Sequence, residues 1–218
     1  MIAENLKELK ATIPEHVTLI AVSKTKPVSD IVQAYDAGHR IFGENKIQEM
    51  VSKFEVLPKD IEWHMIGHLQ RNKVKYMAHF VSLIHGVDSL KTLKEINKQA
   101  AKHQRTIACL LQVKIAQEAT KFGLDFSEVE KIMASDELKE LDHIKIVGLM
   151  AMASFTSDQE QIVAEFSSLD AFYRKLQSKY NELTTLSIGM SGDYQIAIEN
   201  GSTMIRVGSA IFGERTYL

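Results

Sequence analysis

The chain has 218 residues, 45% of them hydrophobic and 25% charged, and its formal net charge is −2. A nearly neutral balance of this kind argues against nucleic acid or an anionic membrane as the main partner. No apolar run is long enough to span a membrane, and the N-terminus lacks the apolar core of a signal peptide. The single cysteine, Cys109, excludes a disulfide within the chain and suits a reducing compartment. We therefore expect a cytoplasmic protein.

The apolar pattern alternates between short strands and amphipathic helices along the whole chain. Ile2, Leu6, Leu9 and Ile13 recur at helical spacing and predict an opening helix that Pro14 ends. Strands are predicted at 18–23, 40–43, 61–66, 80–87, 107–113, 144–150, 185–188 and 203–207. Helices are predicted at 28–37, 46–54, 69–78, after an Asp88 cap, after a capping box of Asp125 and Glu128, at 159–183 behind a Ser157 cap, and at 194–199.

Eight strands, most of them followed by a helix, predict an α/β fold. We expect a single (β/α)8 TIM barrel with an extra N-terminal helix, and a doubly wound open sheet is the alternative. No linker or low-complexity segment interrupts the pattern, so residues 1–218 are expected to form one domain. In such a barrel the loops that follow the strands carry the chemistry.

Lys24 lies at the end of the first predicted strand, and Pro27 forces the chain to turn just beyond it. Partial burial at such a position disfavours the ammonium form, and a neutral lysine amine condenses with aldehydes or ketones to give a Schiff base. The neighbouring cation, Lys26, also favours the neutral form of Lys24, because two nearby positive charges repel each other. On this stretch alone, Lys24 as an ordinary surface lysine remains an equal alternative.

The last two predicted strands end in loops suited to an anion. Ser191 and Gly192 precede a short helix, and small residues let a phosphate approach the backbone. Arg206, Gly208 and Ser209 lie at the end of the eighth strand and add donors beside them. A lysine amine with a phosphate cradle indicates a phosphorylated aldehyde, either pyridoxal 5′-phosphate or a sugar phosphate.

Two histidines near the end of the third strand, His64 and His68, are four residues apart. Gly67 and the strand end between them prevent a shared helical face, and no His-Glu-x-x-His frame is present, so we predict no metal site. Both are candidates for the pocket or its surroundings. Met150, Met152 and Met190, at or near strand ends, are interpreted as packing residues, with contact to one face of a bound ring as the alternative.

Six ordered segments carry a resemblance to a known family. They are Ala-Val-Ser-Lys-Thr-Lys-Pro (21–27), Phe-Gly-Glu-Asn (42–45), Trp-His-Met-Ile-Gly-His-Leu-Gln-Arg-Asn-Lys (63–73), Gly-Leu-Met-Ala-Met (148–152), Leu-Ser-Ile-Gly-Met-Ser-Gly-Asp (186–193) and Gly-Ser-Thr-Met-Ile-Arg-Val-Gly-Ser-Ala-Ile-Phe-Gly (201–213). Together they resemble the YggS/PROSC family of pyridoxal-phosphate homeostasis proteins, which is similar to the N-terminal barrel of alanine racemase. The resemblance agrees with the predicted barrel.

The resemblance implies a cofactor, pyridoxal 5′-phosphate, and a role for each site residue. Lys24 is then the Schiff-base lysine, and Arg206 lies against the pyridine nitrogen. Ser191 and the backbone of Gly208 and Ser209 hold the phosphate. Asn45 is implied as a further pocket residue. No residue is assigned a catalytic role.

Two positions depart from the family pattern. In the loop 117–123, Ala119 and Thr120 stand where Glu and Ser are more usual, so this loop is left out of the predicted site. Gly192 stands where some relatives carry an acidic residue. We expect this glycine to loosen the phosphate turn without removing it.

The predicted site favours a carrier over an enzyme. An arginine against the pyridine nitrogen keeps that nitrogen unprotonated and weakens the ring as an electron sink. Racemisation also needs a proton donor or acceptor on each face of the substrate, and one lysine serves one face. We therefore expect a monomer that holds pyridoxal 5′-phosphate reversibly and supplies apoenzymes. A weak racemase or lyase is the second hypothesis, and a class I aldolase is the third.

Overall fold

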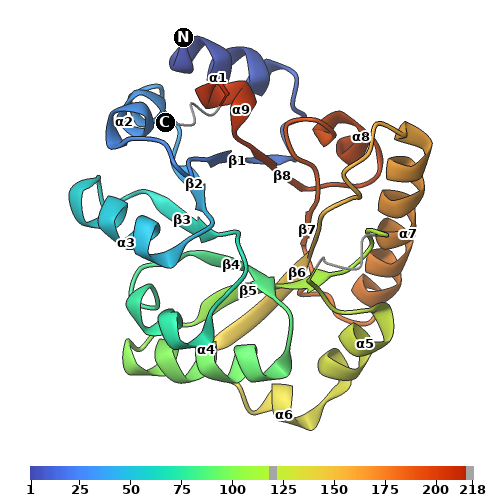
Figure 1. Cartoon of the computed structure of the whole chain (residues 1–218). Coiled ribbons are helices and arrows are strands. Elements are labelled where there is room, and N and C mark those ends of the chain that lie inside the picture. The colour runs from blue at the N-terminus through green and yellow to red at the C-terminus, as the bar shows by residue number, and fades with distance from the viewer. Residues whose placement is uncertain (118–121, 215–218) are drawn as a thin grey trace.

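The computed structural model describes residues 1–117 and 122–214, and these form a closed barrel in which strands β1 to β8 follow one another in sequence order (Figure 1). The strands are β1 (Thr18–Val22), β2 (Ile41–Glu44), β3 (Glu62–Met65), β4 (Leu83–Val87), β5 (Ile107–Val113), β6 (Ile144–Ala151), β7 (Thr185–Ser187) and β8 (Met204–Val207). All neighbouring strands are parallel, and β1 pairs with β8 to close the barrel, with Leu19 opposite Ile205. The predicted (β/α)8 barrel is confirmed.

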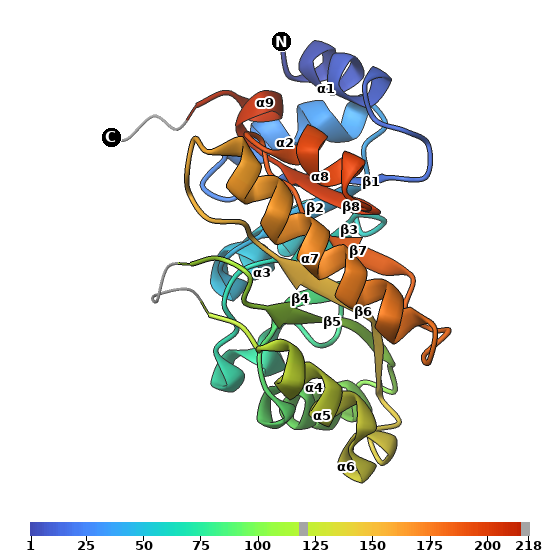
Figure 2. The ribbon, with the colours of Figure 1, turned by 90° about the vertical axis from the view of Figure 1, so that its right-hand side faces the viewer.

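Helices surround the barrel, and the extra N-terminal helix lies beside the last one (Figures 1 and 2). The helices are α1 (Ile2–Ala11), α2 (Val28–Asp36), α3 (Ile47–Val56), the 3-10 helix η1 (Arg71–Tyr76), α4 (Leu90–Lys102), α5 (Phe126–Ala134), α6 (Asp136–Lys139), α7 (Gln159–Gln177), α8 (Tyr194–Glu199) and α9 (Ser209–Phe212). Asn5 of α1 donates a hydrogen bond to the carbonyl of Ile211 at 3.0 Å, which ties the two ends of the chain together. Within residues 1–117 and 122–214, no helix has both the length and the apolar character to cross a membrane.

Alternation along the strands divides the core into two parts. Side chains on the outer face of the barrel, such as Leu19, Phe42 and Trp63, pack against the helices. A smaller apolar layer fills the interior, formed by Ile20, Leu83, Leu110, Met150 and Met204. Two residues beyond Met204 along β8, Arg206 enters the same interior, so the barrel becomes polar toward its carboxyl end.

Several predicted boundaries are wrong. The helix expected at 69–78 is only the short 3-10 helix η1, in which Val74 alone is buried, because its polar residues give no apolar stripe. The cap of α4 is Ser89 rather than Asp88, and the cap of α7 is Asp158 rather than Ser157.

Helix α7 ends six residues before the predicted Leu183. The side chains of Tyr173 and Gln177 donate to the carbonyl of Leu183 at 3.0 and 2.7 Å, so the chain folds back onto the helix instead of extending it. The short helices α6 and α9 are not predicted at all.

Candidate functional site

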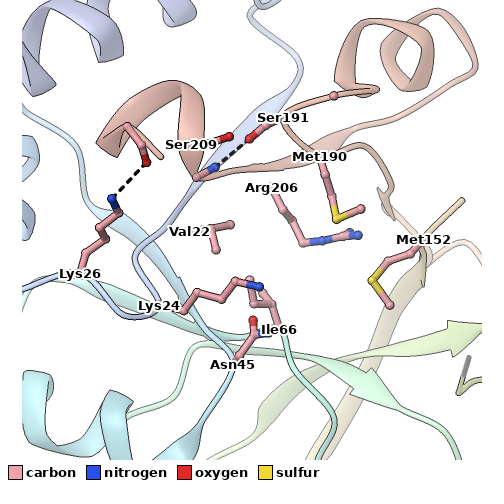
Figure 3. Close-up of a pocket in the computed structure, with 13 residues that line it drawn as sticks. Val22, Lys24, Lys26, Asn45, Ile66, Met152, Met190, Ser191, Arg206 and Ser209 are labelled. Atoms are coloured by element: carbon pink, nitrogen blue, oxygen red, sulfur yellow. Dashed lines mark hydrogen bonds between the residues drawn. The ribbon is translucent and has the colours of Figure 1, made fainter. Parts of the chain in front are cut away.

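A cavity of about 280 Å³ opens at the carboxyl ends of the strands (Figure 3). Its lining includes all six residues predicted for the site, namely Lys24, Asn45, Ser191, Arg206, Gly208 and Ser209. Lys26 lines it as well, and among the described residues no carboxylate does. Three cationic side chains around one small cavity favour an anionic ligand.

Lys24 lies two residues beyond β1, after the buried Ser23, and its half-buried side chain extends into the cavity (Figure 3). The next residue, Thr25, has φ 64°, a left-handed conformation that a β-branched residue rarely adopts. This turn places the side chains of Lys24 and Lys26 on diverging paths (Figure 3). Only Lys24 lies across the cavity floor near Asn45.

Lys26 caps the end of α9. Its Nζ donates to the carbonyls of Phe212 and Gly213 at 3.0 Å and of Glu214 at 3.2 Å. A cation at a helix C-terminus stabilises the carbonyls left unpaired there. Lys26 therefore links the β1 loop to α9.

The predicted anion cradle is formed by two loops that meet above the cavity. Gly189, at φ 99°, turns the chain after β7 so that Ser191 lies over the start of α9. The Ser191 hydroxyl accepts a hydrogen bond from the backbone N–H of Gly208 at 3.2 Å. Ser191 and Ser209 lie side by side at the edge of the cavity (Figure 3). Hydroxyls and backbone N–H groups are ordinary phosphate ligands.

Arg206 forms the inner wall of the cavity and is 4% exposed. Its Nη1 donates to the carbonyl and hydroxyl oxygens of Ser187, both at 2.7 Å, and its Nη2 donates to the carbonyl of Ala151 at 2.9 Å. Burial lowers the pKa of Arg206 to about 10, so the guanidinium stays protonated at neutral pH. The cavity therefore has a fixed cation at its base.

Arg206 is the first member of a buried hydrogen-bonded chain across the barrel. His85 Nδ1 lies 3.1 Å from the Ser187 hydroxyl, and His85 Nε2 lies 3.1 Å from His64 Nδ1. A guanidinium only donates, so Ser187 accepts from Arg206 and its own proton is available to His85. Burial lowers the pKa of His64 to about 3 and places the pKa of His85 well below its usual value. Both histidines are therefore neutral at physiological pH.

Two members of this hydrogen-bonded series, His85 and Ser187, were not predicted from the sequence. Each faces the barrel interior from a strand otherwise expected to carry apolar side chains there. A polar residue inside an apolar strand is the signal that identifies them. His64 was a candidate for the surroundings of the pocket, and it lies within the chain that supports Arg206.

The remaining candidates divide between the cavity and its surroundings. Met152, Met190, Val22 and Ile66 supply its apolar lining. His68 is exposed, stacks on Phe122 and lies 3.6 Å from Asp88. Within the described ranges no cluster of three metal-ligating side chains occurs. In the loop 117–123, Ala119 and Thr120 lie outside the described residues.

Comparisons with known proteins bear on this site. Residues 1–216 match the family described as alanine racemase, N-terminal domain. The pyridoxal phosphate homeostasis protein of Vibrio alginolyticus is 41% identical over 209 residues, which cover 94% of this chain and 89% of that protein. Its namesake from Escherichia coli K12 is 37% identical over 230 residues, covering 99% and 97%.

Solved structures give the same picture. PipY of Synechococcus elongatus PCC7942, solved with PLP bound, superposes with a TM-score of 0.89 at 37% identity and covers 98% of this chain and 100% of that chain. Alanine racemase of Clostridium difficile 630 has a TM-score of 0.82 at 15% identity, over 57% of its length. At that identity the likeness is one of fold alone.

Proposed function

This chain belongs to the family of pyridoxal phosphate homeostasis proteins, and on that premise we propose that it binds pyridoxal 5′-phosphate reversibly as a Schiff base on Lys24. In the cell it maintains the supply of this cofactor and of the related B6 vitamers. The observation that supports the proposal most directly is the meeting of a lysine and an anion cradle in one cationic cavity.

The residues present suit each part of the cofactor. Lys24 provides the amine, and its condensation with the aldehyde forms a C=N bond and releases one water, made from the aldehyde oxygen and two amine protons. Ser191, Ser209 and the backbone at Gly208 provide the phosphate ligands. Asn45 lies beside Lys24 at the cavity floor, and apolar side chains such as Met152 face the ring.

Arg206 determines what the bound cofactor is able to do. Pyridoxal 5′-phosphate supplies an electrophilic carbonyl and a ring that accepts electrons, most strongly when its nitrogen is protonated. Arg206 is a protonated donor held by three hydrogen bonds, and beside the ring nitrogen it keeps that nitrogen unprotonated. We therefore propose that the protein holds the cofactor without robust turnover of amino acids.

The cellular setting is proposed with the same reasoning. The cavity opens at the mouth of the barrel, where an incoming amine reaches the bound aldehyde, so transfer to apoenzymes of pyridoxal phosphate is a suitable route of release. We propose that the protein acts in the cytoplasm as a monomer, and sedimentation measurements with and without the cofactor test the monomeric state.

A titration of the purified protein with pyridoxal 5′-phosphate tests the proposal. We expect a visible absorption band that reaches saturation at one cofactor per chain. Incubation with a panel of L- and D-amino acids should then shift the band without appreciable racemised or cleaved product. Racemised or cleaved product formed over many turnovers per chain, even well below the rate of about 1–1000 s⁻¹ that is usual for enzymes, would instead establish the weak racemase or lyase alternative.

A further inference from the structure

A group of polar and charged side chains lies beneath the Lys24 turn, between the ends of β1 and β2 and helix α3; all of its members are buried except Glu49, whose side chain is 22% exposed. We call Ser23, Glu44, Glu49 and Lys53 the turn clamp. Lys53 Nζ donates to the Ser23 carbonyl at 2.8 Å and to one oxygen of each carboxylate at 2.7 Å. An ammonium has three protons, so Lys53 uses all of its donors within the clamp.

The turn clamp holds the backbone on both sides of Lys24. On one side, the Ser23 hydroxyl donates to Glu44 Oε1 at 2.6 Å, and its carbonyl accepts from Lys53. On the other side, the backbone N–H of Thr25 donates to Glu49 Oε1 at 2.5 Å. The residue before Lys24 and the residue after it are therefore bound to the same ammonium, directly or through one carboxylate.

Burial of the charged groups of the turn clamp costs desolvation free energy. Ser23 and Glu44 are fully buried, and the side chain of Lys53 is 6% exposed. Burial raises the pKa of Glu44, although the Lys53 ammonium opposes the shift. Replacing a buried ion pair by apolar side chains is often neutral or stabilising, so this pair contributes little that an apolar contact would not.

The conformation of Thr25 shows what the clamp accomplishes. A left-handed β-branched residue costs on the order of 1–3 kcal/mol and persists only where its surroundings impose it. Two hydrogen bonds hold it here: the Thr25 N–H donates to Glu49, and the Lys26 N–H donates to the Ser23 carbonyl at 3.0 Å, an acceptor that Lys53 also binds. The same left-handed turn separates Lys24, in the cavity, from Lys26, at the end of α9.

We propose that the turn clamp is a positioning device that fixes the Lys24 amine for attack on the aldehyde of pyridoxal 5′-phosphate, with Glu49 and Lys53 as its positioning residues. This inference rests on the proposed function. The clamp acts on the rate of bond formation at Lys24 and leaves the anion cradle unchanged, because none of its members lines the cavity.

The test compares Glu49→Ala with Glu49→Gln. Alanine removes the acceptor for Thr25, whereas glutamine keeps an oxygen in the same place. The rate of Schiff-base formation is measured at saturating pyridoxal 5′-phosphate, and the affinity of the cradle is measured with pyridoxine 5′-phosphate, which has no aldehyde. Glu130→Ala, which breaks the exposed ion pair with Lys175 far from the cavity, is the matched control.

We expect Glu49→Ala to slow bond formation about tenfold, since small misplacements of a reacting group have effects of this order or larger. Pyridoxine 5′-phosphate affinity should stay within about twofold, below the effect of one ordinary hydrogen bond. Glu49→Gln should restore most of the rate. Amide hydrogen exchange at Thr25 should be faster in Glu49→Ala than in the wild type or in Glu130→Ala.

Two results would overturn the inference. One is an unchanged rate of Schiff-base formation in Glu49→Ala. The other is an equal loss of affinity for both ligands together with a lower melting temperature, which is the result expected if Glu49 has a purely structural role. Lys53→Met, which leaves Glu44 buried and unpaired, is a second variant whose larger slowing should follow the same pattern if it folds. If the wild-type protein itself forms no bond at Lys24, the proposed function fails first, and the inference fails with it.

Discussion

The two sides of the cavity are built on different principles. The anion side uses backbone N–H groups and hydroxyls at Ser191, Gly208 and Ser209, and among the described residues that line it no acid is present. The amine side depends on one reacting side chain, Lys24, held from below by buried charges. A backbone cradle tolerates loss of a single side chain, whereas a positioned amine does not. Binding and bond formation should therefore be separable by mutation.

The largest separation is expected from Lys24→Ala. Without the amine, no covalent adduct with pyridoxal 5′-phosphate forms at this position, and the visible band is lost. Affinity for pyridoxine 5′-phosphate should fall by no more than about threefold. The cradle remains, and only the small attraction between the Lys24 ammonium and the ligand's phosphate is lost. An equal loss of affinity for pyridoxal 5′-phosphate and pyridoxine 5′-phosphate would contradict the separation of the two sides.

A larger side chain at Gly208 is the most direct way to disrupt phosphate binding on the anion side. A Cβ atom at Gly208 would lie 3.1 Å from the Val22 carbonyl oxygen and 3.3 Å from Val22 Cβ, so Gly208→Val has no room without displacing the cradle. We expect affinities for pyridoxal 5′-phosphate and pyridoxine 5′-phosphate to fall together, by roughly 5- to 150-fold, as overpacking of about 1–3 kcal/mol implies. Calorimetric titration measures both, and a loss confined to the aldehyde would count against this assignment.

The buried histidines His64 and His85, which lie behind Ser187 and Arg206, predict a dependence of stability on pH. The pKa of His64 is lowered to about 3 and that of His85 is well below 6.5, so the unfolded chain binds more protons than the folded chain as the pH falls below about 6.5. The free energy of unfolding should decrease over that range by up to about 1.4 kcal/mol per pH unit for each histidine. In His85→Asn, the free energy of unfolding, measured by denaturant titration between pH 5 and 7, should change less with pH than in the wild type. An unchanged pH dependence would contradict the assignment of this effect to His85.

Lys26→Met tests the link between the two sides. Losing a cation at a helix C-terminus costs about 0.3–1 kcal/mol, so we expect a small loss of stability and a decrease of up to about fivefold in affinity for both phosphorylated ligands. The rate of bond formation at saturation should not change. A selective effect on that rate would instead indicate that Lys26 takes part in the chemistry.

A modest effect, similar in size to that of Lys26→Met, is expected at Ser191. The Ser191 hydroxyl is one of several donors, so Ser191→Ala should weaken binding of pyridoxine 5′-phosphate by roughly two- to tenfold, the value of one hydrogen bond. Fluorescence or calorimetric titration measures it. A complete loss of binding would show that the cradle depends on this side chain rather than on the backbone.

Most of the barrel was predictable because each strand is a local apolar run. The run 18–23 and the turn at Pro27 place Lys24 at a strand end without any knowledge of the fold. Helix boundaries were less predictable where a tertiary contact decides them, as when Tyr173 and Gln177 bind the carbonyl of Leu183. Helix α9 is too short for its apolar pattern to be distinguished from a strand or loop.

The site shows the same division. The residues that line the cavity follow strand ends and were identified from local patterns and from the resemblance. Apart from His64, the groups beneath them were not identified, because their partners are distant in the sequence. Ser23 follows β1 whereas Glu44 ends β2, and Ser187 is 102 residues from His85. Only the closed barrel brings such pairs together.

The most direct test of the account is to trap the bound cofactor and locate it. The protein is saturated with pyridoxal 5′-phosphate, reduced with borohydride, digested and mapped by mass spectrometry, with Lys24→Ala as the control. The account predicts one stable adduct, on Lys24, and none in the variant. An adduct on Lys26 or elsewhere, or no adduct at all, would contradict the assignment of Lys24 as the residue that holds the cofactor.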